Sequence, residues 1–171
     1  VSAFLLNRSS DLSFDICNEN DFIYGGDVFG AGKGFASGDF KNFCNVPNTD
    51  VTINGGNVYG DVYGGGENGH VLSNTDVKVL GTASVGILAN NNGGTTTFDG
   101  NVFVGGWGSG YYEIDNTGSV PDTIAFHIYE DCGRVGGNTN VTMSGGAIQG
   151  TIFGGGRLAL VGVDSIGHSY I

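Results

Sequence analysis

The chain has few basic residues and no long apolar run, and both shortages exclude classes of function. Lysine and arginine together number 6 against 17 aspartates and glutamates, which gives the 171 residues a formal charge of −11. The basic residues are scattered singly, so no patch exists that could neutralise nucleic-acid phosphates. No run approaches the length of a membrane-spanning helix, and an acidic chain is repelled by anionic membrane surfaces. We therefore expect no nucleic-acid partner and no membrane span.

Cysteine is also scarce, and its spacing carries no recognisable motif. Cys17, Cys44 and Cys132 show neither CxxC nor Cys/His spacing, which argues against a zinc site and against a disulfide-dense scaffold. One bridge between Cys17 and Cys44 is an option that would leave an odd thiol. Whether any of the three forms a disulfide is open at this point.

Cofactor motifs are missing as well. The segment 30–34 lacks the glycine spacing and the Ser or Thr of a phosphate-binding loop. The segment 64–69 shares glycines and acids with calcium-binding nonapeptide repeats, but the aspartate that those repeats require is absent. We expect no cofactor, and a calcium site stays open.

Glycine, by contrast, is abundant and organised in repeats. There are 34 glycines and 2 prolines without a Gly-X-Y period, which excludes collagen and assigns the glycines to turns and close packing. Residues 48–66 align without gaps onto residues 138–156, and partial copies occur at residues 26–32, 74–79 and 100–106. A unit used at least four times indicates a repeat architecture.

Each unit reads as short strands separated by glycine corners. Val51 and Ile53 alternate with polar neighbours, which is the period of a half-buried strand, and residues 57–59 and 61–63 read as two shorter strands. Strands this short gain stability when identical coils stack and each strand pairs with its copy. The sequence therefore predicts an all-β fold, a parallel β-helix or β-solenoid, in a single domain of residues 1–171.

Spacing and composition add detail to this fold. Asn48 and Asn74 start copies 26 residues apart, so the chain would hold about six or seven coils. With Asn138 they recur at one position, which predicts an asparagine ladder at a corner. Three segments interrupt the pattern: residues 1–22, residues 88–97, whose part 90–97 reads as a polar loop, and a loop insertion at residues 111–131. Within the last, residues 124–129 fit either a strand or a flap.

The units also carry a family resemblance. Val-Tyr-Gly-Gly-Gly and Asn-Thr-x-Val-x-Ile-x-Gly-Gly resemble the glycine-rich repeats of large secreted surface proteins of gut and environmental bacteria, often described as adhesin-like. The resemblance covers about half of the chain. It implies an extracellular or cell-surface location. The sequence opens at Val1 without a signal peptide, so we expect a mature protein or a partial piece of a longer one.

Aromatic residues mark the candidate contact surface. In the repeated units one aromatic residue follows a branched apolar residue: Phe29, Tyr63, Phe103 and Phe153. Because adjacent side chains of a strand face opposite sides, the branched residues pointing inward predict a ladder of aromatic rings pointing outward. An insertion, a glycan or another subunit could cover such a ladder. Alternatively, the rings fold into the core and the valines pack at a corner. Trp107, Tyr111 and Tyr112, in a glycine-rich stretch, would also suit glycan contact.

Two functions follow from these residues. The first is a structural or adhesive surface protein that is not an enzyme and whose solenoid presents a face for self-association, for a cell-surface glycan or for a protein partner. The alternative is a carbohydrate-active β-helix enzyme, a polysaccharide lyase or a glycoside hydrolase, which needs clustered acids. Its candidate acids lie in the insertion: Glu113, Asp115, Asp122, Glu130 and Asp131. Six basic residues make a lyase site for anionic sugars hard to build.

Overall fold

The computed structural model describes residues 26–36, 44–91, 94–98, 100–115, 117, 122–129 and 131–162. Within these ranges the protein consists of 16 strands and contains no helix, so the predicted all-β class is confirmed. The part of the chain that is described accordingly offers no helix that could cross a bilayer.

The largest sheet is parallel and has four strands. Its order is β1 (Val28–Phe29), β5 (Val62–Tyr63), β11 (Val102–Phe103) and β16 (Ile152–Phe153). Every strand pairs with its neighbour in the same register, branched residue to branched residue and aromatic to aromatic. We call it the aromatic sheet.

Three smaller parallel sheets accompany it. The first sheet holds the longest strands of the parallel sheets: β3 (Thr49–Ile53), β7 (Thr75–Val79) and β14 (Thr139–Met143), which pair in the order β14-β7-β3. The second sheet consists of β15 (Ala147–Ile148), β8 (Ser84–Val85) and β4 (Asn57–Val58). The third joins β2 (Asn45–Val46) to β6 (His70–Val71). Copies of the unit from distant parts of the sequence are therefore hydrogen-bonded neighbours.

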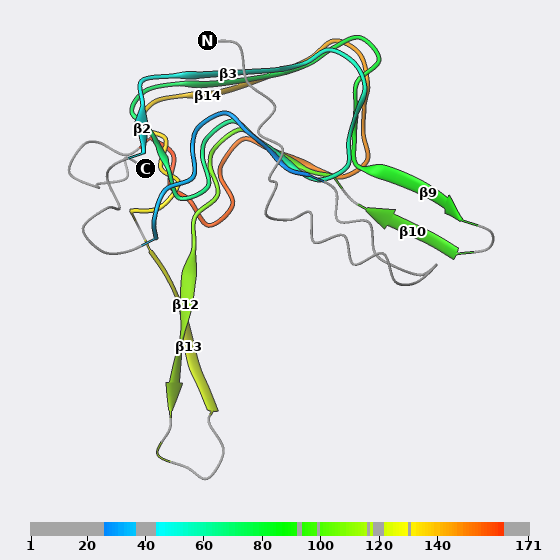
Figure 1. Ribbon diagram of the computed structural model, residues 1–171. Coiled ribbons are helices and arrows are strands. Elements are labelled where there is room, and N and C mark those ends of the chain that lie inside the picture. The colour runs from blue at the N-terminus through cyan, green and yellow to red at the C-terminus, as the bar shows by residue number, and fades with distance from the viewer. Residues whose placement is uncertain are drawn as a thin grey trace.

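The chain runs through these sheets in the same order three times. We call one such run a circuit: β3-β4-β5 is the first, β7-β8-β11 the second and β14-β15-β16 the third. Figure 1 shows the circuits overlying one another, with β3 and β14, which flank β7 in their sheet, along one edge. With β1 the aromatic sheet has four strands, one for each coil, whereas the repeat length predicts six or seven coils. The two insertions take up part of the chain, and residues 1–22 lie outside the described ranges.

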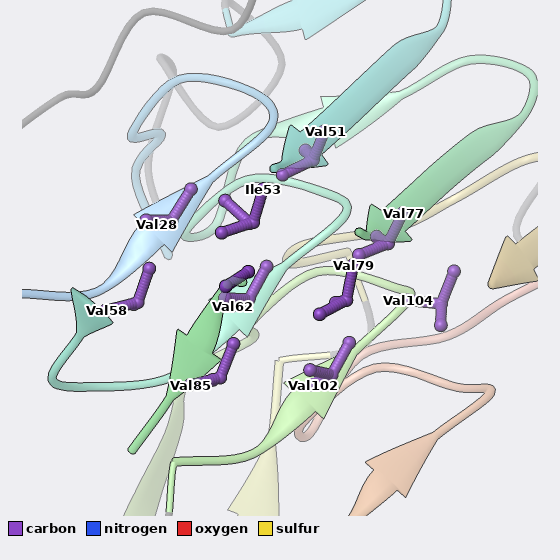
Figure 2. Packing of buried hydrophobic residues seen from close by; sticks show 11 residues of the cluster. Val28, Val51, Ile53, Val58, Val62, Val77, Val79, Val85, Val102 and Val104 are labelled. Carbon is purple, nitrogen blue, oxygen red and sulfur yellow. The ribbon is translucent and has the colours of Figure 1, made fainter. Parts of the chain in front are cut away.

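Branched side chains fill the space inside the circuits. In β3 the residues alternate between buried and exposed, as the period of two predicts. The valines and isoleucines of successive circuits meet there (Figure 2), and the cluster consists of Val28, Val51, Ile53, Val58, Val62, Val77, Val79, Ala83, Val85, Val102 and Val104. Burial of this row is the main favourable contribution to folding.

The predicted asparagine ladder is present at the start of the long strands. The side-chain oxygen of Asn48 accepts a hydrogen bond from the backbone N–H of Asn74 at 3.1 Å, and that of Asn74 accepts one from Asn138 at 2.9 Å. Each asparagine thus fixes the register of the next circuit.

Two antiparallel hairpins leave the circuits, and they correct the predicted loops. The prediction of a polar loop at residues 90–97 is wrong, because β9 (Ile87–Asn91) pairs there with β10 (Gly94–Phe98). Threonine favours strands, and Asn-Gly at 92–93, outside the described residues, is a hairpin signal in the sequence. The loop predicted at residues 111–131 is instead largely β12 (Gly110–Asp115) paired with β13 (Asp122–Ile128). Both hairpins project away from the circuits (Figure 1).

The cysteines do not form the suggested bridge. Cys44 carries a free thiol, and its suggested partner Cys17 lies outside the described residues. The sulfur of Cys44 donates to the carbonyl of Lys33 at 3.0 Å, whereas that of Cys132 donates to the carbonyl of Ala36 at 3.2 Å. Each thiol therefore pairs with backbone.

Candidate functional site

The repeated aromatic residues form a continuous stack on the aromatic sheet. Ring centroids lie 4.7 Å apart between Phe29 and Tyr63, 5.0 Å between Tyr63 and Phe103, and 4.7 Å between Phe103 and Phe153. The rings are within 8° of parallel at every step. Their partners Val28, Val62 and Val102 belong to the inner cluster, so the rings occupy the opposite side of the strands.

Residues of the same chain cover this stack. Trp107 stacks on Tyr63 at 5.5 Å and on Phe29 at 6.2 Å, between ring centroids. The guanidinium of Arg157 lies 4.5 Å from the Trp107 ring centroid in a cation–π contact, and it donates to the hydroxyl of Tyr63 at 3.5 Å. Glu67, Trp107 and Arg157 share one register position, since isolated parallel bridges join them. Glu67 and Arg157 each follow a glycine triplet, whereas Trp107 follows the pair Gly105-Gly106.

Exposure differs strongly along the stack. Tyr63 is 0% exposed and Phe29 is buried, so neither offers a ring face to a ligand. Phe103 is partly buried, whereas Phe153 is 42% exposed because no further aromatic ring lies above it in the described chain. The stack therefore serves mainly as a second core, and its accessible part is the end at Phe153.

The β12-β13 hairpin carries three exposed aromatic side chains, those of Tyr111, Tyr112 and Phe126. On one face the ring of Tyr111 lies between His127, at 5.1 Å, and Tyr129, at 5.2 Å. On this same face the His127 Nε2 atom lies 2.8 Å from a carboxylate oxygen of Glu113. We call these four residues the tyrosine face. It combines two tyrosine rings with the imidazole of His127 and the carboxylate of Glu113, and the two polar groups can exchange hydrogen bonds with a ligand.

The opposite face of the hairpin is apolar. Tyr112 packs against Phe126 with ring centroids 4.9 Å apart, and Ile114 and Ile128 follow at alternate positions of their strands. All four side chains are exposed. An isolated two-stranded ribbon is marginally stable in water, and exposed apolar side chains on it mark a contact surface.

The acids proposed for an enzyme are tied to separate partners. Glu113 pairs with His127, Asp115 accepts a backbone hydrogen bond from Thr117 at 2.8 Å, and Asp131 pairs with Arg134 at 3.3 Å. Glu130 lies outside the described residues. Glu113, Asp115 and Asp131 therefore each have a local partner that accounts for the position of the side chain.

Acidic side chains at the aromatic sheet also have structural roles. A carboxylate oxygen of Asp27 accepts a hydrogen bond from the backbone N–H of Asp61 at 2.8 Å, and Asp61 accepts one from Asn101 at 2.7 Å. The amide oxygen of Asn101 continues the series to the N–H of Thr151 at 3.0 Å. The described residues contain no group of three or more His, Cys, Asp or Glu side chains placed to hold a metal ion.

Several residues of these surfaces were not predicted. Arg157, His127 and Tyr129 have no aromatic repeat to mark them as contacts, and the sequence marks Glu113 only as a candidate acid of the enzyme alternative. The alternation of residues on both sides of the insertion tip, at 110–115 and 122–128, was the available signal for a hairpin.

No protein-family model, no curated protein and no solved structure matches this chain.

Proposed function

We propose that the chain is a β-solenoid of an extracellular or cell-surface protein, with a structural and adhesive role and no catalytic one. The solenoid acts as a stiff support, and the β12-β13 hairpin is its contact element, which binds a cell-surface glycan through the tyrosine face. The observation that carries this proposal is the contact of the Tyr111 ring with His127 and Tyr129 beside the carboxylate of Glu113, which pairs with His127.

The support for a solenoid lies in the regular pairing of the circuits. Strands from three circuits pair in parallel and in register in three separate sheets, and asparagine and aromatic ladders run along them. The glycine-rich units resemble those of secreted adhesin-like proteins, which favours an extracellular location. A support of this kind holds a projecting hairpin at a fixed place.

The chemistry of the tyrosine face favours a sugar. Aromatic rings pack against the apolar face of a sugar ring, while a carboxylate and an imidazole can bind its hydroxyl groups. The apolar face with Tyr112 and Phe126 lacks such a pair of polar groups. The formal charge of −11 favours a neutral or cationic glycan over an acidic one.

A glycan array with two matched variants tests the proposal. Tyr111→Ala removes the central ring of the tyrosine face, and we expect it to abolish binding of the glycans that the unchanged protein captures. Tyr112→Ala removes the neighbouring ring on the opposite face, and we expect it to retain binding. Thermal unfolding of both variants checks that the circuits stay folded.

Two outcomes would contradict glycan binding. Capture of no glycan by the unchanged protein would exclude it, and equal loss in both variants would show that the tyrosine face has no special part. Concentration-dependent assembly that Tyr112→Ala removes would instead identify the hairpin as a self-association element.

A further inference from the structure

The β12-β13 hairpin belongs to a part of the chain that has acids and no lysine or arginine. Between Lys78 and Arg134 the sequence contains neither basic residue, whereas residues 110–131 include five acids. The formal charge of the whole chain, −11, has the same sign. One of the five acids, Glu113, lies on the tyrosine face itself. The electrostatic potential over this face therefore attracts cations and repels anions.

The carboxylate of Glu113 is held in place and is still accessible. Its Oε2 atom lies 2.8 Å from the Nε2 atom of His127, and this contact fixes the side chain on the tyrosine face. The side chain of Glu113 is nevertheless 52% exposed, and its Oε1 atom takes no part in the contact. Because a carboxylate accepts several hydrogen bonds through its two oxygens, Glu113 can accept one from a ligand and keep His127 as its partner.

The residue opposite Glu113 is small. Glu113 pairs across the hairpin with Ala125, and the next residue of β12, Ile114, pairs with Thr123, so a bulge follows directly. Bulges re-aim neighbouring side chains and are common beside functional sites. The methyl group of Ala125 fills little of the surface beside the carboxylate. Along β12, Tyr111 lies two positions and about 7 Å away, so one ligand can contact both side chains.

A second carboxylate follows on the same strand. The alternation of β12 places Asp115 on the side of Tyr111 and Glu113, about 7 Å beyond Glu113. Hydrogen bonds from the hydroxyl and the backbone N–H of Thr117 lower the pKa of the Asp115 carboxyl below its ordinary value, so this group is ionised at neutral pH. A linear ligand that lies along β12 therefore meets an aromatic ring and then two carboxylates.

We propose that the tyrosine face binds an amino sugar, a glycan unit whose free amino group is protonated. The sugar ring packs against Tyr111 and Tyr129, and its ammonium group donates to the carboxylate of Glu113. This inference rests on the glycan binding proposed above and names the class of glycan. N-acetylated and neutral sugars lack the ammonium group, and acidic sugars are repelled.

Isothermal titration with two oligosaccharides of equal length and linkage tests the class of glycan. A glucosamine tetramer and its fully N-acetylated form differ only in amine against amide. At neutral pH we expect the glucosamine tetramer to bind about fivefold more tightly, the effect of an exposed ion pair. About 1 M salt should remove this preference through screening. Equal affinity for the two tetramers at low salt would overturn the inference and leave glycan binding intact.

Glu113→Gln tests the residue that pairs with the amine. Glutamine keeps the size of the side chain and its contact with His127 but removes the charge. Affinity for the glucosamine tetramer should fall about fivefold, and affinity for the acetylated tetramer should not change. Thermal unfolding at the temperature of the unchanged protein shows that the circuits stay folded.

Asp131→Asn is the matched control. It makes the same change of charge at an acid that lies outside the tyrosine face, where it pairs with Arg134 at 3.3 Å. We expect this variant to bind the glucosamine tetramer as the unchanged protein does. Equal loss of affinity in Glu113→Gln and Asp131→Asn would show that only the total charge of the chain matters, and would overturn the inference.

Spermidine distinguishes a sugar site from a general cation site. It carries ammonium groups without a sugar ring, so it should not displace the glucosamine tetramer at equal concentration. Displacement at the affinity of the tetramer would overturn the inference, because charge alone would then account for binding. Failure of the unchanged protein to bind either tetramer or any glycan of an array would refute glycan binding itself, which is a different result from equal binding of the two tetramers.

Discussion

The side-chain oxygen of Asn74 accepts a hydrogen bond at 2.9 Å from the backbone N–H of Asn138, a residue 64 positions later in the sequence. Between them lie both hairpins, yet the next strands pair residue for residue, from Thr75 with Thr139 to Val79 with Met143. The insertions are therefore accommodated outside the circuits and do not shift the register.

Replacing Asn74 with alanine tests the contribution of this ladder. Asn74→Ala removes the acceptor for the Asn138 N–H, and we expect the free energy of unfolding to fall by about 1 kcal/mol. Urea denaturation measures the change. Asn140→Ala, an exposed residue of β14, is the control and should have no effect within error. Equal effects of the two substitutions would show that the ladder contributes nothing specific.

Buried threonines provide a second test. Thr75 is 0% exposed, and its hydroxyl donates to the carbonyl of Val104 at 2.6 Å. Thr139, in the edge strand β14, makes the equivalent bond to the carbonyl of Gly154 at 2.6 Å. Thr75→Val keeps the shape but leaves a buried carbonyl without this donor, which costs about 1–3 kcal/mol. Thr139→Val should cost less, because water can reach Gly154. Chemical denaturation of both variants decides, and a larger loss for Thr139→Val would contradict this account.

Repetition explains how much of the fold could be predicted from the sequence. Residues 48–66 and 138–156 match position by position, and stacking places matching residues side by side, as Thr49, Thr75 and Thr139 show. The alternation of Val51 and Ile53 gave the buried face of β3 for the same reason. Repeated local patterns are thus sufficient to predict the repeated strands and which strands pair with one another.

Features that occur once were harder to predict. The asparagines and threonines of residues 90–97 are polar and predict a loop, whereas β9 and β10 pair there as a hairpin, and Asn-Gly in the sequence favours a tight hairpin turn. Trp107 and Arg157 cover the aromatic stack by reaching across to rings of earlier circuits. Side-chain reach of this kind depends on the path of the chain after the glycines that precede each residue, which periodicity does not encode.

The glycine corners predict opposite results for two equivalent positions. Gly65→Ala would place its Cβ 2.7 Å from the Cα of Gly106, so the circuits must separate locally and stability should fall by about 1–3 kcal/mol. Gly155→Ala meets no atom within 4 Å and should change stability by less than about 0.5 kcal/mol. Thermal and urea unfolding measure both. Tolerance of Gly65→Ala would show that the spacing of the circuits is not fixed by backbone contact.

Alkaline pH should destabilise the protein through Tyr63. Burial raises the pKa of its hydroxyl above the ordinary value; the hydrogen bond from Arg157 opposes this shift, and the nearby charge of Asp61 adds to it. The folded protein therefore keeps this proton at pH values where the unfolded chain has released it. The contribution is complete below about pH 10, the pKa of an unperturbed tyrosine, and is lost as pH rises through the folded pKa.

Urea unfolding between pH 8 and pH 11 measures this loss. Above about pH 10 the unchanged protein should lose up to about 1.4 kcal/mol of unfolding free energy per pH unit through this one proton. Tyr63→Phe removes the titrating group, so this part of the slope should disappear, at a cost of about 1 kcal/mol at neutral pH for the lost hydrogen bond to Asp61. Tyr59→Phe, at a tyrosine that is 45% exposed, should keep the full slope. An unchanged slope in Tyr63→Phe would mean that the stack opens to solvent before its hydroxyl ionises.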